Sequence, residues 1–180
     1  MHFVQFTLNP PAAVVAAAYG SFSAPKEQEI VVARQGGALE LLRPDEATGR
    51  LATVASTATF SCVRALCAVR PTGAATDDVA VASDAGTLTV LRFDAARGAW
   101  TRIHCETFGK TGCRRAVPGQ YLAADPRGRA VMVAAVERTK LVYTLNRDAA
   151  GAPTISSPLE AHKARCVVFD VVALDVGFDN

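Results

Sequence analysis

The chain has 180 residues, half of them hydrophobic and a fifth charged, and a formal net charge of +2. This composition is typical of a globular protein and excludes an intrinsically disordered chain. So small a net charge favours no class of partner by itself, and no apolar run approaches the roughly 18 residues that a membrane-spanning helix needs.

Strand-forming patterns occupy nearly the whole chain. Short runs of small and β-branched apolar residues alternate with clusters of Asp, Gly and Pro, which reverse a chain at low cost. In chain order we expect strands at 2–8, 14–19, 28–34, 38–42, 51–58 and 61–69, a hairpin at 78–92, a strand at 99–107, a unit of several strands at 120–160 and a strand at 165–176. We also expect a turn at 146–148 and one helical turn at 156–160, the latter from a capping-box pattern.

One hairpin pattern recurs three times along the sequence. The copies are EIVVARQGGALELLR (29–43), DVAVASDAGTLTVLR (78–92) and AVMVAAVERTKLVYTL (130–145). Setting Glu29 on Asp78 gives an offset of 49 residues, and setting Leu88 on Leu141 gives an offset of 53. Repeats of roughly 40 to 50 residues with several strands each are the signature of β-propeller blades.

We therefore predict an all-β fold, a partial WD40-like β-propeller of about three four-stranded blades and the start of a fourth. Because closed propellers have about four to eight blades, we expect the chain to be the N-terminal fragment of a larger propeller protein. The expected segments are an N-terminal strand and linker (1–11), three blades (12–58, 61–107 and 119–160) and the start of the next blade (165–180).

The cysteines indicate the compartment. They are five, an odd and irregularly spaced set that lies mostly inside or beside apolar strands. Reduced cysteine in such places behaves as a small hydrophobic residue, and no basic region followed by an apolar core marks a secretory signal. We therefore expect a reducing compartment, the cytosol or the nucleus.

Sequence signals for catalysis or metal binding are weak. Gly109, Lys110 and Thr111 resemble the end of a phosphate-binding loop, but His104 stands where that motif needs its first glycine. The paired Cys-x2-Cys spacing of zinc sites does not occur. The three histidines are scattered, and nothing nominates a nucleophile together with its base. We expect no enzyme activity, no cofactor, no metal site and no small-molecule substrate.

Positive charge gathers in one segment, 108–129. Five cations stand there against the single acid Asp125, and we take them as candidate contact residues: Lys110, Arg114, Arg115, Arg127 and Arg129. Arginine forks bind carboxylate or phosphate through two hydrogen bonds, so the segment is a candidate contact for an acidic protein surface or an RNA backbone. The alternative is architectural, with some of the arginines satisfying loop carbonyls between the second and third blades.

The same segment carries a family resemblance. The stretches HCETFGKTGCRRAVPGQ, TKLVYTLNRDAAG and TISSPLEAHKA, with the earlier GSFSAPKEQEIVVAR and VASDAGTLTVLRFD, closely resemble the N-terminal region of the third-subunit family of splicing factor 3b. That family is similar to the damaged-DNA-binding ubiquitin-ligase adaptor and to the large cleavage and polyadenylation factor subunit, which are built from three propellers and a helical domain. The resemblance implies that residues 1–180 are the opening blades of the first propeller.

The resemblance also implies a function. It is that of a non-catalytic scaffold of splicing factor 3b in the U2 small nuclear ribonucleoprotein, in the nucleus. Its expected partners are the HEAT-repeat subunit and a small helical subunit, which together support branch-site recognition in pre-mRNA. An indirect or phosphate-backbone contact with pre-mRNA or small nuclear RNA is also expected, and no membrane.

Several alternatives stay open at this point. The chain could serve as a propeller adaptor in a DNA-repair ubiquitin ligase or in mRNA 3′-end processing, or as a propeller enzyme. It could also be a truncated fragment without function, because relatives continue past Asn180. The first hairpin turn, at 35–38, is one residue longer than is usual in the family.

Overall fold

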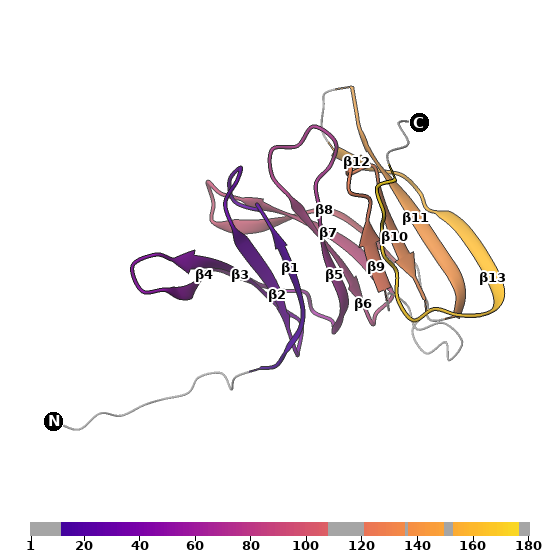
Figure 1. Ribbon diagram of the computed structural model, residues 1–180, viewed down its shortest axis with the longest axis horizontal. Coiled ribbons are helices and arrows are strands. Elements are labelled where there is room, and N and C mark those ends of the chain that lie inside the picture. The colour runs from indigo at the N-terminus through magenta and orange to yellow at the C-terminus, as the bar shows by residue number, and fades with distance from the viewer. Residues whose placement is uncertain (1–11, 108–120, 136, 150–152, 177–180) are drawn as a thin grey trace.

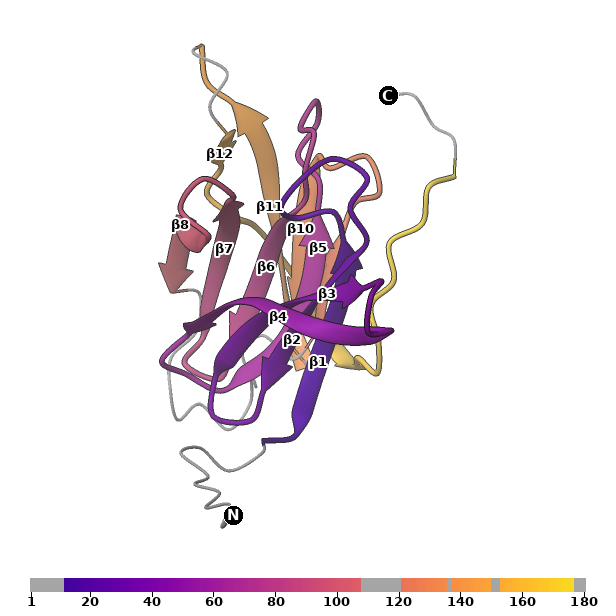
Figure 2. The same ribbon diagram turned by 90° about the vertical axis from the view of Figure 1, so that its left-hand side faces the viewer.

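The computed structural model describes residues 12–107, 121–135, 137–149 and 153–176, and every regular element in these ranges is a β-strand. The strands form three antiparallel sheets that stand side by side (Figure 1). Figure 2 shows the same arrangement from the side of the first sheet. No segment of the described ranges forms a helix with the length and hydrophobicity of a membrane span.

The first two sheets have four strands each, paired in sequence order. Sheet 1 contains β1 (Val14–Gly20), β2 (Glu29–Arg34), β3 (Ala38–Asp45) and β4 (Arg50–Ala58). Sheet 2 contains β5 (Val63–Val69), β6 (Asp78–Ser83), β7 (Thr87–Asp94) and β8 (Ala99–Thr107). The tight turn between β2 and β3 contains Gly36 and Gly37, whose φ angles of 95° and 86° suit glycine and few other residues.

Sheet 3 has an additional short strand. Its members are β9 (Tyr121–Ala124), β10 (Ala130–Ala134), β11 (Glu137–Arg147), β12 (Pro153–Ile155) and β13 (Leu159–Val167). Both β12 and β13 pair with β11, β12 at its C-terminal end and β13 along its N-terminal half. The long β11 therefore serves two successive outer strands.

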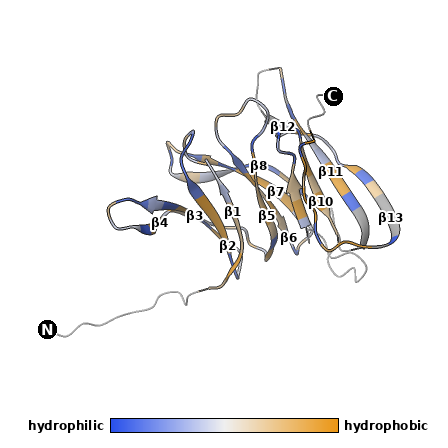
Figure 3. Ribbon diagram, in the orientation of Figure 1, coloured by the Kyte–Doolittle hydropathy of each residue, from blue (hydrophilic) through white to orange (hydrophobic). Residues whose placement is uncertain are grey.

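The sheets are arranged as neighbouring propeller blades. The first strands β1, β5 and β9 lie next to one another, as the inner strands of adjacent blades do, and the outer strands diverge (Figure 1). This confirms the all-β, propeller-type prediction. Hydrophobic residues concentrate on the strands in the middle of the molecule, and the β3–β4 hairpin carries more hydrophilic ones (Figure 3).

Strand β6 shows why the sequence of the middle sheet contains an unbroken apolar run. All six of its residues are buried. Val79 and Val81 pack toward sheet 1, against a cluster that includes Val31 and Leu41. Ala80, on the opposite side of the strand, packs toward sheet 3. A strand covered on both faces cannot show the alternation of a half-exposed one.

The alignment of the third hairpin was wrong by one residue. In sheet 2 the last pair before the turn is Ala82 with Leu88, and in sheet 3 it is Ala134 with Lys140. The structural offset is therefore 52 residues, and Lys140 takes the place of Leu88, whereas Leu141 packs toward sheet 2. Matching leucine to leucine slipped the register, and a slip of one residue turns every side chain to the other face.

Three further expectations differ from the structure. Residues 165–167 complete β13, but 168–176 contain no strand. Asn146 and Arg147 continue β11, paired with β12, and do not form a turn. Leu159 begins β13 where a helical turn was expected, because pairing with β11 outweighs a local capping pattern. The expected strand at 2–8 lies outside the described residues, and the start of a further blade at 165–180 stays a prediction.

Candidate functional site

Two of the five candidate cations lie in the described part of the chain, and both face carboxylates. Arg129 Nε donates a hydrogen bond of 2.7 Å to Asp125 Oδ2, and Arg127 Nε lies 3.3 Å from Asp175 Oδ2. The hydrogen bond from Arg129 holds the pKa of Asp125 below its usual value, against a smaller opposing effect of burial. Lys110, Arg114 and Arg115 lie outside the described residues.

The turn that carries these two arginines is docked on sheet 2. Gly128 has a φ of 69°, and a Cβ there would lie 1.5 Å from the carbonyl oxygen of Arg70. Thr72 donates its backbone N–H to the Gly128 carbonyl and its hydroxyl to the Arg127 carbonyl, at 3.3 and 3.1 Å. This geometry supports the architectural alternative for Arg127 and Arg129. Contact of the segment with RNA or an acidic surface stays a prediction.

A third ion pair joins the ends of the inner strands. Arg70 donates two hydrogen bonds to the Asp77 carboxylate, at 2.8 and 2.9 Å. Asp77 also accepts the backbone N–H of Ser21 at 2.7 Å, so this carboxylate joins sheet 2 to sheet 1. A small hollow of about 330 Å³ lies beside it, where β1, β5 and β9 end.

An acid and an arginine are repeated at corresponding positions of the first two sheets. Arg43 pairs with Glu29 at 2.6 Å, and Arg92 pairs with Asp78 at 2.8 Å. Both carboxylates are fully buried, and both pairs keep the 49-residue offset. In sheet 3 the corresponding positions are occupied by Ala130 and Thr144, which pair with each other, so the third hairpin cannot form this ion pair.

A large groove lies between the outer strands of sheets 1 and 2. This groove, of about 490 Å³, exists because β4 and β8 diverge while the inner strands stay close. Six hydroxyl side chains from both sheets line it: Thr57, Thr59, Ser61, Ser83, Thr87 and Thr89. Trp100 closes one end, packed edge-to-face against Phe93 with ring centres 5.4 Å apart.

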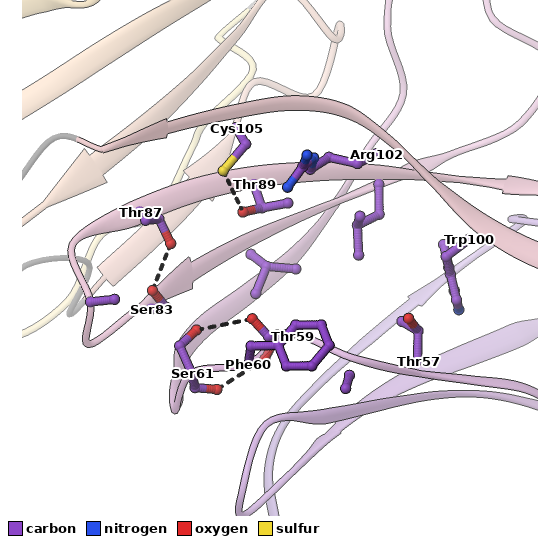
Figure 4. A pocket seen from close by; sticks show the side chains of 14 residues that line it. Thr57, Thr59, Phe60, Ser61, Ser83, Thr87, Thr89, Trp100, Arg102 and Cys105 are labelled. Carbon is purple, nitrogen blue, oxygen red and sulfur yellow. Dashed lines mark hydrogen bonds between the residues drawn. The ribbon is translucent and has the colours of Figure 1, made fainter.

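Of the described residues that line the groove, one is charged, Arg102, which lies beside Cys105 (Figure 4). Most of the hydroxyls are already engaged: Ser83 and Thr87 are 2.7 Å apart, and Thr89 donates to Cys105 Sγ at 3.5 Å. Arg102 makes no ion pair with any carboxylate among the residues that the structure describes. The groove therefore offers an uncompensated positive charge between neutral polar walls.

Phe60 stands at the edge of this groove in an unusual backbone conformation. Its side chain is 94% exposed and its φ is 58°, in the left-handed region that large side chains rarely adopt. The Thr59 hydroxyl holds the backbone on both sides, with bonds of 2.8 Å to Gly37 O and 2.9 Å to Ser61 O. A β-carbon on Gly37 would lie 2.2 Å from Ser61 O, so the linker is tightly seated.

Two side chains that could act as nucleophiles or bases, a thiol and a phenol, are held in the neutral form by burial. Burial raises the pKa of the Cys67 thiol to about 12, and burial with the nearby Glu106 charge raises that of the Tyr143 phenol to about 12. Neither group is prepared to act as a nucleophile or base near neutral pH. Within the described ranges, no three metal-ligating side chains are gathered in one place.

Comparison with known proteins decides the family. Residues 13–180 match the model described as the RSE1/DDB1/CPSF1 first beta-propeller. The chain belongs to this propeller family. The three sheets are accordingly propeller blades 1, 2 and 3.

Several relatives that match the chain over its full length are splicing proteins by name. The chain is 51% identical over its full length to "Splicing factor 3B subunit 3" of Drosophila melanogaster and 53% identical to the protein of that name from Danio rerio. It is 48% identical to "Spliceosome-associated protein 130 A" of Arabidopsis thaliana. In each case the match spans 15% of the relative's length.

Sequence reasoning missed the groove and Phe60. The repeated acid and arginine were visible, because their spacing is the same in two copies of the hairpin. The groove had no sequence signal, because it arises from the divergence of two strands some fifty residues apart. Phe60 had a weak one, an aromatic residue between the predicted strands 51–58 and 61–69.

Proposed function

We propose that the chain supplies the opening blades of a non-catalytic scaffold subunit of splicing factor 3b in the U2 small nuclear ribonucleoprotein. The proposal depends on one observation, the 51% identity over all 180 residues to a protein named "Splicing factor 3B subunit 3". In this role the protein acts in the nucleus and supports branch-site recognition through protein–protein contacts.

The proposed partners are the HEAT-repeat subunit and the small helical subunit of that complex. Contact with pre-mRNA or small nuclear RNA is proposed only through phosphates, at Lys110, Arg114 and Arg115. Arg127 and Arg129 contribute less, because each already has a carboxylate partner. Contact of this kind is sensitive to salt and indifferent to base sequence.

A chimaera tests the scaffold role. In the Drosophila melanogaster relative the region aligned to this chain is replaced by the chain itself, and the tagged protein is captured from nuclear extract. We expect the HEAT-repeat subunit to be recovered in the same yield as with the unaltered relative. A matched chimaera with Leu88→Asp, which puts a charge into the core between blades 2 and 3, serves as the misfolded control.

Three outcomes separate the alternatives. Recovery of the HEAT-repeat subunit supports the splicing scaffold. Recovery of a cullin-type ligase or of 3′-end processing factors in its place supports a sibling adaptor role, which the shared family model accommodates. A folded chimaera that captures none of them contradicts the proposal.

A further inference from the structure

We propose that the groove between β4 and β8 binds an extended, acidic peptide segment of a partner protein, which pairs with β4 as a fifth strand of blade 1. The peptide would pack an apolar side chain on Phe60 and direct a carboxylate to Arg102. This inference does not depend on the splicing role, because it follows from the chemistry of the groove.

The first step is the open edge of β4. This strand is the last in its sheet, so the backbone groups along one side have no partner strand. Proteins usually protect such edges with charged residues, as β8 does with Arg102 and Glu106 and as β13 does with Glu160. In β4 the one charged residue is Arg50 at its start, and residues 51–58, which include the part next to the groove, carry no charge. An uncharged edge is the surface that an added peptide strand uses.

The usable part of this edge lies next to the groove. A bulge at Val54 interrupts the pairing of β3 with β4, so that Leu41 pairs with Ala55 and Leu42 with Thr53. Regular pairing continues from Ala55 to Ala58. Ala55 and Thr57 are the two half-buried residues of this stretch, and Thr57 lines the groove. Because side chains alternate along a strand, every second side chain of an added strand would face the groove.

Phe60 supplies an anchor at the end of this edge. A left-handed φ is strained in a large residue, and strained backbone of this kind clusters at ligand-binding and switching sites. Here the strain holds a fully solvated aromatic ring in place, although burying the ring would be favourable. Exposed aromatic residues on a rigid backbone are typical of the residues that dominate peptide and protein interfaces.

Arg102 determines the charge of the partner. Among the residues that the structure describes, it is the only charged one that lines the groove, and it has no carboxylate partner there. Among the surrounding hydroxyls, Ser83 and Thr87 bond to each other and Thr89 donates to Cys105 Sγ. These neutral groups neither compensate the guanidinium nor repel an anion. An acidic side chain on the partner would therefore complete a charge-assisted hydrogen bond that the chain itself leaves open.

Selection from a peptide library tests the proposal. Random twelve-residue peptides on phage are panned against the 180-residue chain, and binders that also bind the Phe60→Ser/Arg102→Glu double variant are removed. We expect the surviving peptides to share an acidic residue near an apolar one. A synthetic copy of one of them should slow amide hydrogen exchange in residues 55–58, and methylation of its backbone nitrogens should abolish binding.

Single variants and controls sharpen the test. Phe60→Ser and Arg102→Glu should each weaken the synthetic peptide at least about tenfold in fluorescence anisotropy, as truncation of an interface anchor does. Tyr19→Ser and Arg97→Glu change another exposed aromatic residue and another exposed arginine, both away from the groove, and they should leave affinity unchanged. All four positions are solvated, so each variant should keep the melting curve of the parent chain.

Two results would overturn the proposal. One is a selection in which no surviving peptide depends on both Phe60 and Arg102. The other is a dimer in sedimentation velocity that Ser56→Pro, a change at the β4 edge, converts to monomer, since a second copy of the chain would then be the natural occupant of this edge.

Discussion

Two buried carboxylates at corresponding positions of blades 1 and 2 have pKa values displaced in opposite directions. Burial opposes the ionisation of both. At Glu29 the backbone N–H groups of Ser23 and Phe22, the Ser23 hydroxyl and Arg43 outweigh this effect, and the pKa is lowered. Asp78 has the Arg92 side chain but no backbone donor among the described residues, so burial, aided by the Asp77 charge, prevails and its pKa is raised. Backbone donors, more than the arginine, decide the difference.

The stability of the chain should reflect this contrast below pH 6. The lowered pKa of Glu29 means that its contribution is present above the unfolded value near 4.5 and is lost as pH falls through the folded value. The raised pKa of Asp78 has the opposite sign, because its ionisation costs stability as pH rises through the folded value. Urea unfolding at about pH 6.0 and about pH 3.5, on either side of the usual carboxylate pKa, measures the contributions of both carboxylates to stability.

We expect Glu29→Gln to cost about 2 kcal/mol at pH 6, because three donors and Arg43 lose a charged acceptor. This loss of unfolding free energy should be smaller at the lower pH, where the parent chain has itself lost the contribution of ionised Glu29. For Asp78→Asn the loss relative to the parent chain should be larger at the lower pH, where protonation relieves the parent chain of the cost of the buried charge. Equal changes in the two variants would contradict the assignment of the opposite shifts.

At the residue level, prediction from sequence succeeded where both interacting residues lie within one copy of the repeated hairpin. Glu29 and Asp78 were aligned correctly, because both open a hairpin of the same length. The partner of Arg127 could not be predicted, since Asp175 lies 48 residues away in a segment without regular structure. The excess of cations in 108–129 predicted an exposed contact surface. In the structure, tertiary contacts give the two described arginines of this segment carboxylate partners.

At the level of strands, the position of Lys140 provides a test of register. It occupies the place that Leu39 and Leu88 hold in blades 1 and 2, and its Nζ is buried with no hydrogen-bond acceptor in the described ranges. A buried ammonium without a partner is costly. Lys140→Leu should therefore raise the free energy of unfolding by about 1–2 kcal/mol, measured in urea.

The neighbouring residue is the matched control. Leu141 packs against blade 2 in the structure, so Leu141→Lys should lower stability by about 3 kcal/mol or more. The 53-residue alignment would have placed Leu141 where Leu88 lies and predicts the same loss, but it puts Lys140 on the opposite face. Destabilisation by Lys140→Leu would therefore favour that alignment over the observed register.

Most strands could be predicted because each combines an apolar pattern with a strong turn signal. The pattern failed where tertiary pairing decides the outcome. Leu159–Val167 became β13 because β11 offers it a long partner, although the strand itself alternates charged and small residues. The apolar residues of 168–176 form no strand, because strand formation needs a neighbouring strand to pair with as well as a suitable sequence.

The whole molecule shows how blade packing creates surfaces that no single strand encodes. Inner strands lie close together and outer strands diverge, so the junction between blades 1 and 2 is filled with apolar side chains inside and is open outside. Blades 1 and 2 leave the groove at their junction. On the far face of blade 3, residues 171–174 lie beside Met132 and Val142 and enclose a hollow of only about 190 Å³.

This far face should make the 180-residue chain associate with itself. Four apolar side chains of the segment that crosses it are exposed: Phe169 at 84%, Val172, Leu174 and Val176. Contiguous exposed apolar surface of this kind is removed from water by association. Light scattering after size-exclusion chromatography should give a mass that rises with concentration, and Phe169→Ser/Leu174→Ser should restore the monomer mass. Phe60→Ser removes another highly exposed ring, at the groove, and should leave association unchanged. A parent chain that stays monomeric at every concentration would contradict this expectation and would show that residues 168–176 already shield the apolar face of blade 3 from water.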